Sequence, residues 1–163
     1  MKECFDALDK KLIVALTGDG QLSAGKLAED LGVTGPTVRS RLRALMDSGL
    51  CRISALVDPF RATGLTVALV GINLSSHQQL GEKMDQIAEL PDVSWAAVVT
   101  GRYDIIAEVV LTEAMSDLYR FMDEDLASVG GIDASESFVV MKARRKWLCL
   151  PKGTRDRFVT KDK

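Results

Sequence analysis

The 163-residue chain has few of the residues on which most enzyme and metal sites depend. It contains one histidine, His77, and three cysteines, Cys4, Cys51 and Cys149, which lie far apart. This spacing supports neither a disulfide framework nor a zinc site, and small apolar fillers in a reducing cytoplasm are the simpler interpretation. A phosphate-cradling glycine loop and a nucleophile elbow are also missing. These absences argue against an enzyme and predict neither a metal nor a cofactor.

Long apolar stretches are missing as well. No apolar run approaches the roughly 18 residues that a membrane-spanning helix needs. The N-terminal sequence MKECFDALDK is too polar for a signal peptide. The chain is nevertheless 47% hydrophobic, which is enough to bury a core in one domain or in two small ones. We therefore expect a cytoplasmic protein without a membrane partner.

The net charge of −2 conceals three segments of different character. Residues 1–63 contain 9 Lys and Arg against 8 Asp and Glu. Residues 64–141 contain 3 against 13, and residues 142–163 contain 9 against 2. An acidic middle thus separates two segments that can face phosphates, so the overall charge does not exclude a nucleic-acid partner.

Residues 27–45, LAEDLGVTGPTVRSRLRAL, predict two short helices joined by a turn. Gly32 can adopt the left-handed conformation that ends the first helix, Thr34 can cap the second, and Pro36 suits its opening turn. The second helix then repeats apolar residues every three or four positions along its inner side. This is the helix-turn-helix pattern.

The outer side of the second helix carries small hydroxyls and guanidiniums and no carboxylate. Such a surface suits the DNA major groove, where arginines can contact phosphates or guanine and hydroxyls can read base edges. The predicted DNA-contacting residues are Thr34, Pro36, Thr37, Arg39, Ser40, Arg41 and Arg43. The alternative is an ordinary helical hairpin with a solvated basic face.

The segments around this pair complete a domain. A helix is predicted over residues 5–17, and residues 51–57 alternate apolar and polar side chains like a half-buried strand. Three helices and a strand make a winged helix-turn-helix DNA-binding domain, which we place at residues 1–57. A linker over residues 58–65 follows, where Pro59 favours an extended chain.

Residues 66–147 are predicted to form a second domain with the element order βαββαβ. The predicted elements are strand 66–74, helix 78–90, strand 93–100, strand 105–111, helix 112–127 and strand 132–142. This order is typical of the ferredoxin-like fold, in which both helices cover one face of an antiparallel sheet. The fold class is therefore α+β, a winged helix-turn-helix joined to a ferredoxin-like sandwich. Residues 148–163 are expected to form a basic tail that is either solvated or in contact with DNA.

Both faces of the predicted sheet are apolar, although the helices cover only one of them. Val67 and Leu69 in the first strand, and Ile106 and Val110 in the third, lie opposite the helix-facing residues. The simplest cover is the same sheet from a second copy, giving a symmetric dimer with two recognition helices on one twofold axis. The alternative is that the winged domain folds back over this face.

Together the two halves resemble the Lrp/AsnC, or feast/famine, family of transcription regulators. The stretch LDKKLIVALTGDGQLSAGKLAEDLGVTGPTVRSRLRALMDSGL is similar to the family's N-terminal domain. The stretch VVTGRYDIIAEV is similar to its strand-loop-strand with a TGxYD motif, here residues 100–104. The resemblance implies a regulator that binds double-stranded promoter DNA, dimerises through its C-terminal sheets and often assembles further into octamers.

The resemblance also implies a small effector, usually an amino acid, bound between dimers beside the TGxYD loop. Backbone amides near Gly101 could hold a carboxylate, Asp104 could pair with the ammonium group, and Tyr103 could cover the side chain. The expected effector-binding residues are Gly101, Arg102, Tyr103, Asp104, Ser135 and Ser137. The alternative is that Gly101 and Arg102 form only a hairpin turn and that Asp104 only caps it.

Two rival functions belong to other classes. Siroheme decarboxylases resemble the same family, but their tetrapyrrole substrate carries several carboxylates, which the acidic middle of this chain does not favour. A small-molecule sensor with a vestigial DNA-binding domain is the other rival, and the carboxylate-free arginine surface argues against it. The sequence therefore predicts an effector-responsive, DNA-binding transcription regulator without enzymatic activity.

Overall fold

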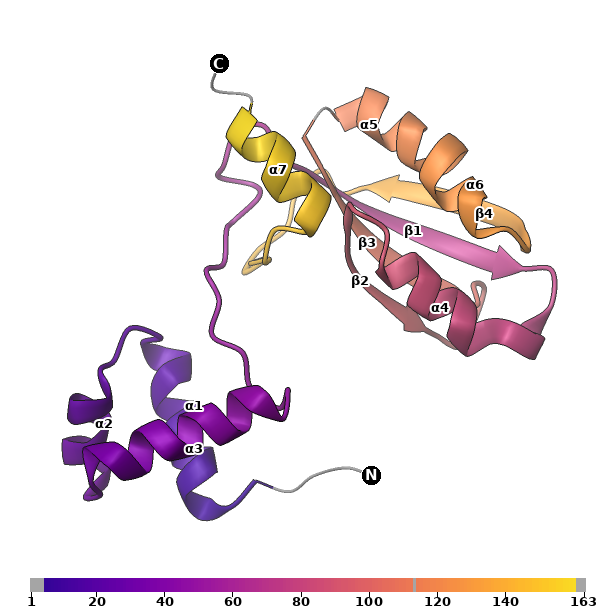
Figure 1. The fold of residues 1–163 in the computed structure, drawn as a ribbon. Helices are drawn as coiled ribbons and strands as arrows, with labels where there is room; N and C mark the ends of the chain where they lie inside the picture. Colours follow the sequence, from indigo (N-terminus) through magenta and orange to yellow (C-terminus); the bar gives the residue numbers. More distant parts are fainter. Residues whose placement is uncertain (1–4, 113, 161–163) are drawn as a thin grey trace. The chain divides into compact units, whose positions relative to one another are not determined.

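The computed structural model describes residues 5–112 and 114–160. It divides into two compact units, Met1–Ser54 and Ala55–Lys163 (Figure 1). Among the described residues, no helix combines the length and apolar character needed to cross a membrane. Cys51 and Cys149 are half-buried, and Cys4 lies outside the described residues.

The first unit consists of three helices whose ends follow from local side-chain chemistry. They are α1 (Ala7–Gly18), α2 (Ala24–Leu31) and α3 (Gly35–Asp47). Asp6 and Asp9 form a reciprocal capping box at the start of α1. Gly32 ends α2 in the left-handed conformation, with φ of 66°, and Thr34 caps α3. The helix-turn-helix prediction is confirmed.

A small core holds these helices together. Leu12, Leu27 and Val38, one from each helix, are fully buried against each other. Leu45 is also buried and Leu42 partly so, as the inward positions of the second predicted helix require. Burying an aliphatic side chain of this size contributes about 1.5–3 kcal/mol. This core therefore fixes the outer face of α3.

The predicted strand over residues 51–57 is wrong, and the described residues contain no wing in this unit. Ile53 and Leu56 are about half exposed, with 48% and 55% of their surface accessible. Only Val57 pairs, through an isolated bridge to Leu148 in which its N–H donates to the Leu148 carbonyl at 2.8 Å and the Leu148 N–H donates back at 3.0 Å. A strand needs a partner along its length, and here the partner meets it at one residue.

The second unit is built on a four-stranded sheet. Its elements are β1 (Thr66–Leu74), a 3-10 turn (His77–Gln79), α4 (Leu80–Ala88), β2 (Val93–Val98), β3 (Ile105–Leu111), α5 (Ala114–Arg120), a π-helical turn (Phe121–Asp125), α6 (Leu126–Val129), β4 (Ile132–Val139) and α7 (Lys152–Thr160). All strand pairs are antiparallel, in the order β2-β3-β1-β4. The ferredoxin-like prediction is confirmed, and the first and third strands have the predicted bounds.

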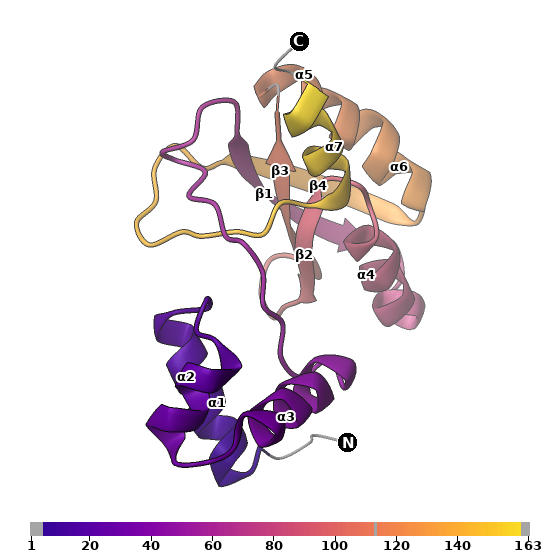
Figure 2. The same cartoon turned by 60° about the vertical axis from the view of Figure 1, so that its left-hand side comes forward.

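The two faces of this sheet have different covers. Helices α4, α5 and α6 lie on one side of it (Figure 2) and bury Val70, Ile72 and Phe121 completely. On the opposite face Val67 and Val110 are buried under Phe60, Leu65 and Leu148. The chain's own segments around Phe60 and Leu148 therefore cover part of the second face. The sequence predicts either a second copy or the winged domain as the cover. Trp95 and Phe138, on the rest of this face, stay 42% and 44% exposed.

The expectation of a solvated tail is wrong for residues 152–160, which form α7 and pack on the second unit. The Thr154 hydroxyl is buried and donates to the Val110 carbonyl at 2.8 Å. The Gly153 N–H donates to the Pro91 carbonyl at 2.8 Å, and Arg157 pairs with Asp92. The segment looked like a tail because polar contacts hold it, and apolar periodicity does not reveal such contacts.

Candidate DNA-binding and effector-binding sites

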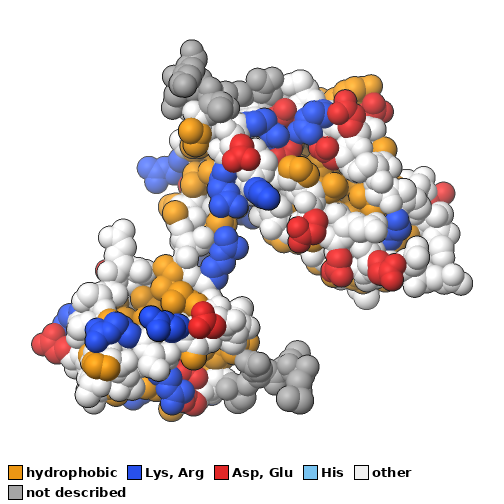
Figure 3. Space-filling model, viewed as in Figure 1, with side chains coloured by type: hydrophobic (Ala, Val, Ile, Leu, Met, Phe, Trp, Pro, Cys, Tyr) orange, Lys and Arg blue, Asp and Glu red, His pale blue; other side chains and the backbone are white. Residues whose placement is uncertain are grey.

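The seven predicted DNA-contacting residues lie at the start and along the outer face of α3, and all of them are exposed. Among the described residues, six of them form no ion pair, and Arg41 is the exception. The Thr34 and Thr37 hydroxyls are hydrogen-bonded to each other at 2.8 Å. Arg39 and Arg43 are four residues apart, so they project from the same side of the helix. Neither forms an ion pair among the residues that the structure describes. Figure 3 shows Lys and Arg side chains over α3.

Arg41 differs from Arg39 and Arg43 because it has acidic partners at the start of α1. Its guanidinium lies 2.6 Å from Asp6 and 3.6 Å from Asp9, the two residues of the capping box. The pKa of Asp6 is lowered, first by the hydrogen bond from the Asp9 N–H and then also by Arg41. Arg41 therefore joins α3 to the start of α1, and a structural role accounts for it without DNA.

In the second unit the TGxYD loop is packed against the open face of the sheet. The Tyr103 ring covers Gly71, where an added Cβ would lie only 2.7 Å from ring carbons. The Tyr103 hydroxyl donates to the Glu136 carboxylate, which raises the pKa of Tyr103. Arg102 lies 5.4 Å above the same ring and 3.1 Å from Glu136. Gly101 has φ of 122°, which favours glycine at this turn.

Asp104 already has two partners, so it is a weak candidate for an ammonium group. Its Oδ2 accepts the Leu74 N–H at 2.8 Å, and its Oδ1 lies 2.8 Å from His77 Nε2. The pKa of Asp104 is lowered, first by the Leu74 hydrogen bond and then by His77. Asp104 thus ties the loop to the end of β1, and His77 serves this contact.

Ser135 and Ser137 do not lie on the Tyr103 side of the sheet, so the structure does not bring them together with the TGxYD loop. They lie opposite Ile72 and Val70, on the face that the helices cover. Glu136, between them, lies opposite Gly71 and reaches Tyr103. Sequence reasoning missed Glu136 because strand alternation shows that neighbouring residues differ in face, but not which face the loop covers.

Ser135 instead lines a hollow of about 360 Å³ at the edge of the sheet. Gly130, Gly131 and Ile132 line it as well, together with residues of the π-helical turn and α6. The expected effector-binding residues therefore fall into two groups, one around Glu136 and one around Ser135.

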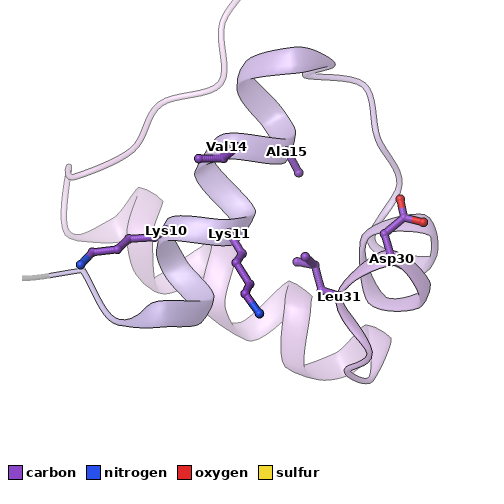
Figure 4. Close-up of a pocket in the computed structure, with 6 residues that line it drawn as sticks. All are labelled: Lys10, Lys11, Val14, Ala15, Asp30 and Leu31. Carbon is purple, nitrogen blue, oxygen red and sulfur yellow. The ribbon is translucent and has the colours of Figure 1, made fainter.

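A larger hollow, of about 550 Å³, lies in the first unit between α1 and α2 (Figure 4). Lys10, Lys11, Val14, Ala15, Asp30 and Leu31 line it. Lys11 extends towards Leu31, whereas Lys10 points away from it (Figure 4). The lining combines neither a nucleophile with a base nor paired carboxylates, and in residues 5–112 and 114–160 no group of three His, Cys, Asp or Glu residues could hold a metal.

Comparisons with known proteins agree with this architecture. The AsnC-type helix-turn-helix domain matches residues 5–46, and the Lrp/AsnC ligand-binding domain matches residues 67–146. An uncharacterised HTH-type transcriptional regulator of Pyrococcus furiosus is 30% identical over 144 residues, covering 88% of this chain and 95% of the relative. A proline dehydrogenase transcriptional activator of Rhodobacter capsulatus is 25% identical over 146 residues, covering 88% and 94%.

Solved structures share the fold. AsnC of E. coli superposes with a TM-score of 0.70 at 21% identity, covering 88% of this chain and 97% of that one. A Neisseria meningitidis regulator in complex with L-Met has a TM-score of 0.70 at 23% identity, covering 91% and 97%. The domain matches in their order and the similarity over nearly the whole chain identify this protein as a member of the Lrp/AsnC family of HTH-type transcriptional regulators.

Proposed function

We propose that this DNA-binding regulator reads a specific operator through α3 and that a small zwitterionic effector, such as an amino acid, changes its assembly or its DNA affinity. The observation that carries the DNA-reading part is the exposed surface of α3 over residues 35–46, which has no carboxylate before Asp47 at the helix end and on which Arg39 and Arg43 have no acidic partner among the described residues. Thr37 and Ser40 are exposed on the same helix and can read base edges. Such a regulator acts on promoter DNA in the cytoplasm.

Substitution of Arg43 tests the proposal that α3 recognises the operator sequence. An arginine that contacts guanine with both nitrogens contributes about 1–3 kcal/mol of discrimination, so Arg43→Ala should weaken binding by about ten- to a hundred-fold. The probe is a duplex selected by the wild-type protein from a random-sequence library, compared with a random duplex in an anisotropy titration. Lys11→Ala removes an exposed cation from α1 and should preserve the preference for the selected duplex. Equal affinities of the Arg43→Ala and wild-type proteins for this duplex would remove Arg43 from the reading surface.

For the effector we propose a site around Arg102, Tyr103 and Glu136. Arg102 and Glu136 form an exposed ion pair, with 77% and 43% of their side chains accessible. A zwitterion offers a carboxylate to the first and an ammonium group to the second, so it can replace their mutual contact with two charge-assisted hydrogen bonds. Asp104 then holds the loop in place and does not contact the effector.

A thermal-shift screen with the twenty amino acids tests the effector site. A ligand at 100 times its Kd stabilises the folded state by about 2.7 kcal/mol, which is easily measured. Glu136→Gln should abolish the shift that the active amino acid produces, whereas Asp133→Asn, an exposed carboxylate in the same strand, should preserve it. A full shift in the Glu136→Gln variant would place the effector elsewhere, with the hollow beside Ser135 as the next candidate.

We also propose that a second copy covers the remaining apolar part of the open sheet face. Trp95 and Phe138 are large apolar side chains exposed there, and a symmetric dimer would bury both from each copy. Sedimentation equilibrium of the wild type and of a Phe138→Glu variant tests this, since the charge should dissociate the dimer. The siroheme decarboxylase alternative finds no support, because the relatives compared above are transcriptional regulators.

A further inference from the structure

Residues 142–146, which follow β4 closely in the chain, form an exposed cationic loop in the second unit. We call this segment, Lys142-Ala143-Arg144-Arg145-Lys146, the basic loop. Lys142, Arg144 and Arg145 are exposed, and none of them forms an ion pair among the described residues. Lys146 is different, because it pairs with the buried carboxylate of Glu108. The loop therefore combines three unneutralised cations with one cation that anchors it.

Contacts on both sides hold the basic loop in a defined position. Before it, the Val140 N–H donates to the Val67 carbonyl at 2.9 Å. After it, the paired hydrogen bonds between Val57 and Leu148 fix the chain again. Within the loop Arg145 has φ of 58°, the one described non-glycine residue in the left-handed region. Such a conformation costs free energy and persists only where its surroundings impose it. The cations are thus presented by an ordered turn.

The position of the basic loop along the chain connects it with DNA binding. The bridge to Val57 places Leu148 close to Ala55, the first residue of the second unit. The chain that carries the helix-turn-helix unit therefore enters the second unit next to the basic loop. Duplex DNA held by α3 continues on both sides of its operator, and its flanking phosphates offer a polyanion to cations carried on the same chain.

The charge of the rest of the unit supports the same partner. Residues 64–141 carry 13 carboxylates against 3 cations, so most of this unit repels a polyanion. A cationic turn that follows this acidic stretch attracts phosphate where the stretch itself does not. We propose that the basic loop is a second DNA contact, which binds backbone phosphates flanking the operator without reading sequence. This inference rests on the proposed DNA-reading function of α3.

Salt dependence of binding by the full-length protein tests it. Each phosphate contact lowers the slope of log affinity against log salt by about 0.9. Arg144→Gln/Arg145→Gln should reduce the magnitude of that slope by nearly 2 for each chain that contacts a random 60-base-pair duplex. The matched control is Lys152→Gln/Arg155→Gln, which removes two exposed cations from α7 and should leave the slope unchanged. Arg144→Lys/Arg145→Lys keeps both charges and should retain the wild-type slope.

Equal slopes for the wild type and Arg144→Gln/Arg145→Gln would overturn the inference, as would an equal loss in the α7 control. Failure of the wild type to bind any duplex would overturn the proposed function as well, so the two failures are distinguishable. Binding to phosphatidylglycerol vesicles that only the loop variant loses, with DNA binding intact, would assign the loop to a membrane and also refute it. In a Trp95→Phe background Trp147 is the single tryptophan, and its fluorescence should change on the 60-base-pair duplex.

Discussion

Asp92 lies in the turn between α4 and β2, is fully buried, and joins two helices that are distant in the sequence. Arg120 of α5 lies 2.6 Å from its Oδ2, and Arg157 of α7 contacts its Oδ1. The Thr154 hydroxyl, which donates to the Val110 carbonyl, lies 3.4 Å from Oδ1. We predict that Asp92→Ala lowers the free energy of unfolding substantially and frees α7 from the sheet.

The magnitude follows from the surroundings of the two arginines. Removing one partner of a fully buried ion pair costs about 3–5 kcal/mol, because the other charge stays buried without compensation. Arg120 and Arg157 are 32% and 33% exposed, and Asp125 and Asp117 remain near them, so part of this penalty is avoided. We expect a loss of about 2–4 kcal/mol, a large share of the roughly 5–15 kcal/mol of a typical domain.

Urea unfolding followed by circular dichroism measures this loss, and trypsin reports on α7 because Lys152 and Arg155 are exposed cleavage sites. Asp92→Ala should accelerate cleavage there at urea concentrations where the sheet is still folded. Asp133→Ala removes an exposed carboxylate and should change stability by less than about 0.5 kcal/mol. If Asp92→Ala costs less than 1 kcal/mol, roughly the value of an exposed pair, the assignment of α7 as an anchored element is refuted.

Three further predictions concern single positions. Gly81→Ala in α4 should stabilise the protein by about 0.5–1 kcal/mol in urea unfolding, because the added Cβ meets no atom within 4 Å. Gly153→Ala should destabilise it, because the added Cβ would lie 2.6 Å from the Pro91 Cβ. Because the folded pKa of Asp104 is lowered, its contribution to stability is present above about pH 4 and is lost as the pH falls through the folded pKa; the stability gap between wild type and Asp104→Ala should therefore close in acid. The folded pKa of Tyr103 is raised, so Glu136→Gln should bring its ionisation, followed by absorbance at 295 nm, to lower pH.

The elements that sequence predicts well are those whose ends and faces are set by neighbours in the chain. Thr34 and Gly32 mark the turn between α2 and α3 through local hydrogen bonds and a left-handed conformation, and both occur as expected. Strands β1 and β3 are apolar on both faces between clear turns, and their observed bounds equal the predicted ones. The sequence pattern and the structure agree for these elements because no contact with a distant segment changes their bounds.

The elements that sequence predicts badly depend on partners far along the chain. Val57 pairs with Leu148, 91 positions further along the chain, so the strand expected around Val57 has no second strand to extend against. Glu136 becomes part of the Tyr103 cluster only because the register between β1 and β4 places it opposite Gly71. Alternation fixed the relation between Glu136 and its neighbours, but a face can be named only when the opposing strand is known.

The number of cations in a segment does not show which of them are free to bind DNA, and the structure does. Counting places many cations near both ends of the chain, yet the structure separates them by what they neutralise. Arg41, Lys146 and Arg157 pair with acids of the same unit and stabilise the fold. Arg39 and Arg43 on α3, and Arg144 and Arg145 on the basic loop, have no such partner among the described residues, so their charge is available to phosphates. A chain with a net charge of −2 can therefore bind a polyanion such as DNA. Its affinity for DNA depends on the unneutralised cations at the contacting surface, whereas carboxylates elsewhere mainly repel DNA from other surfaces.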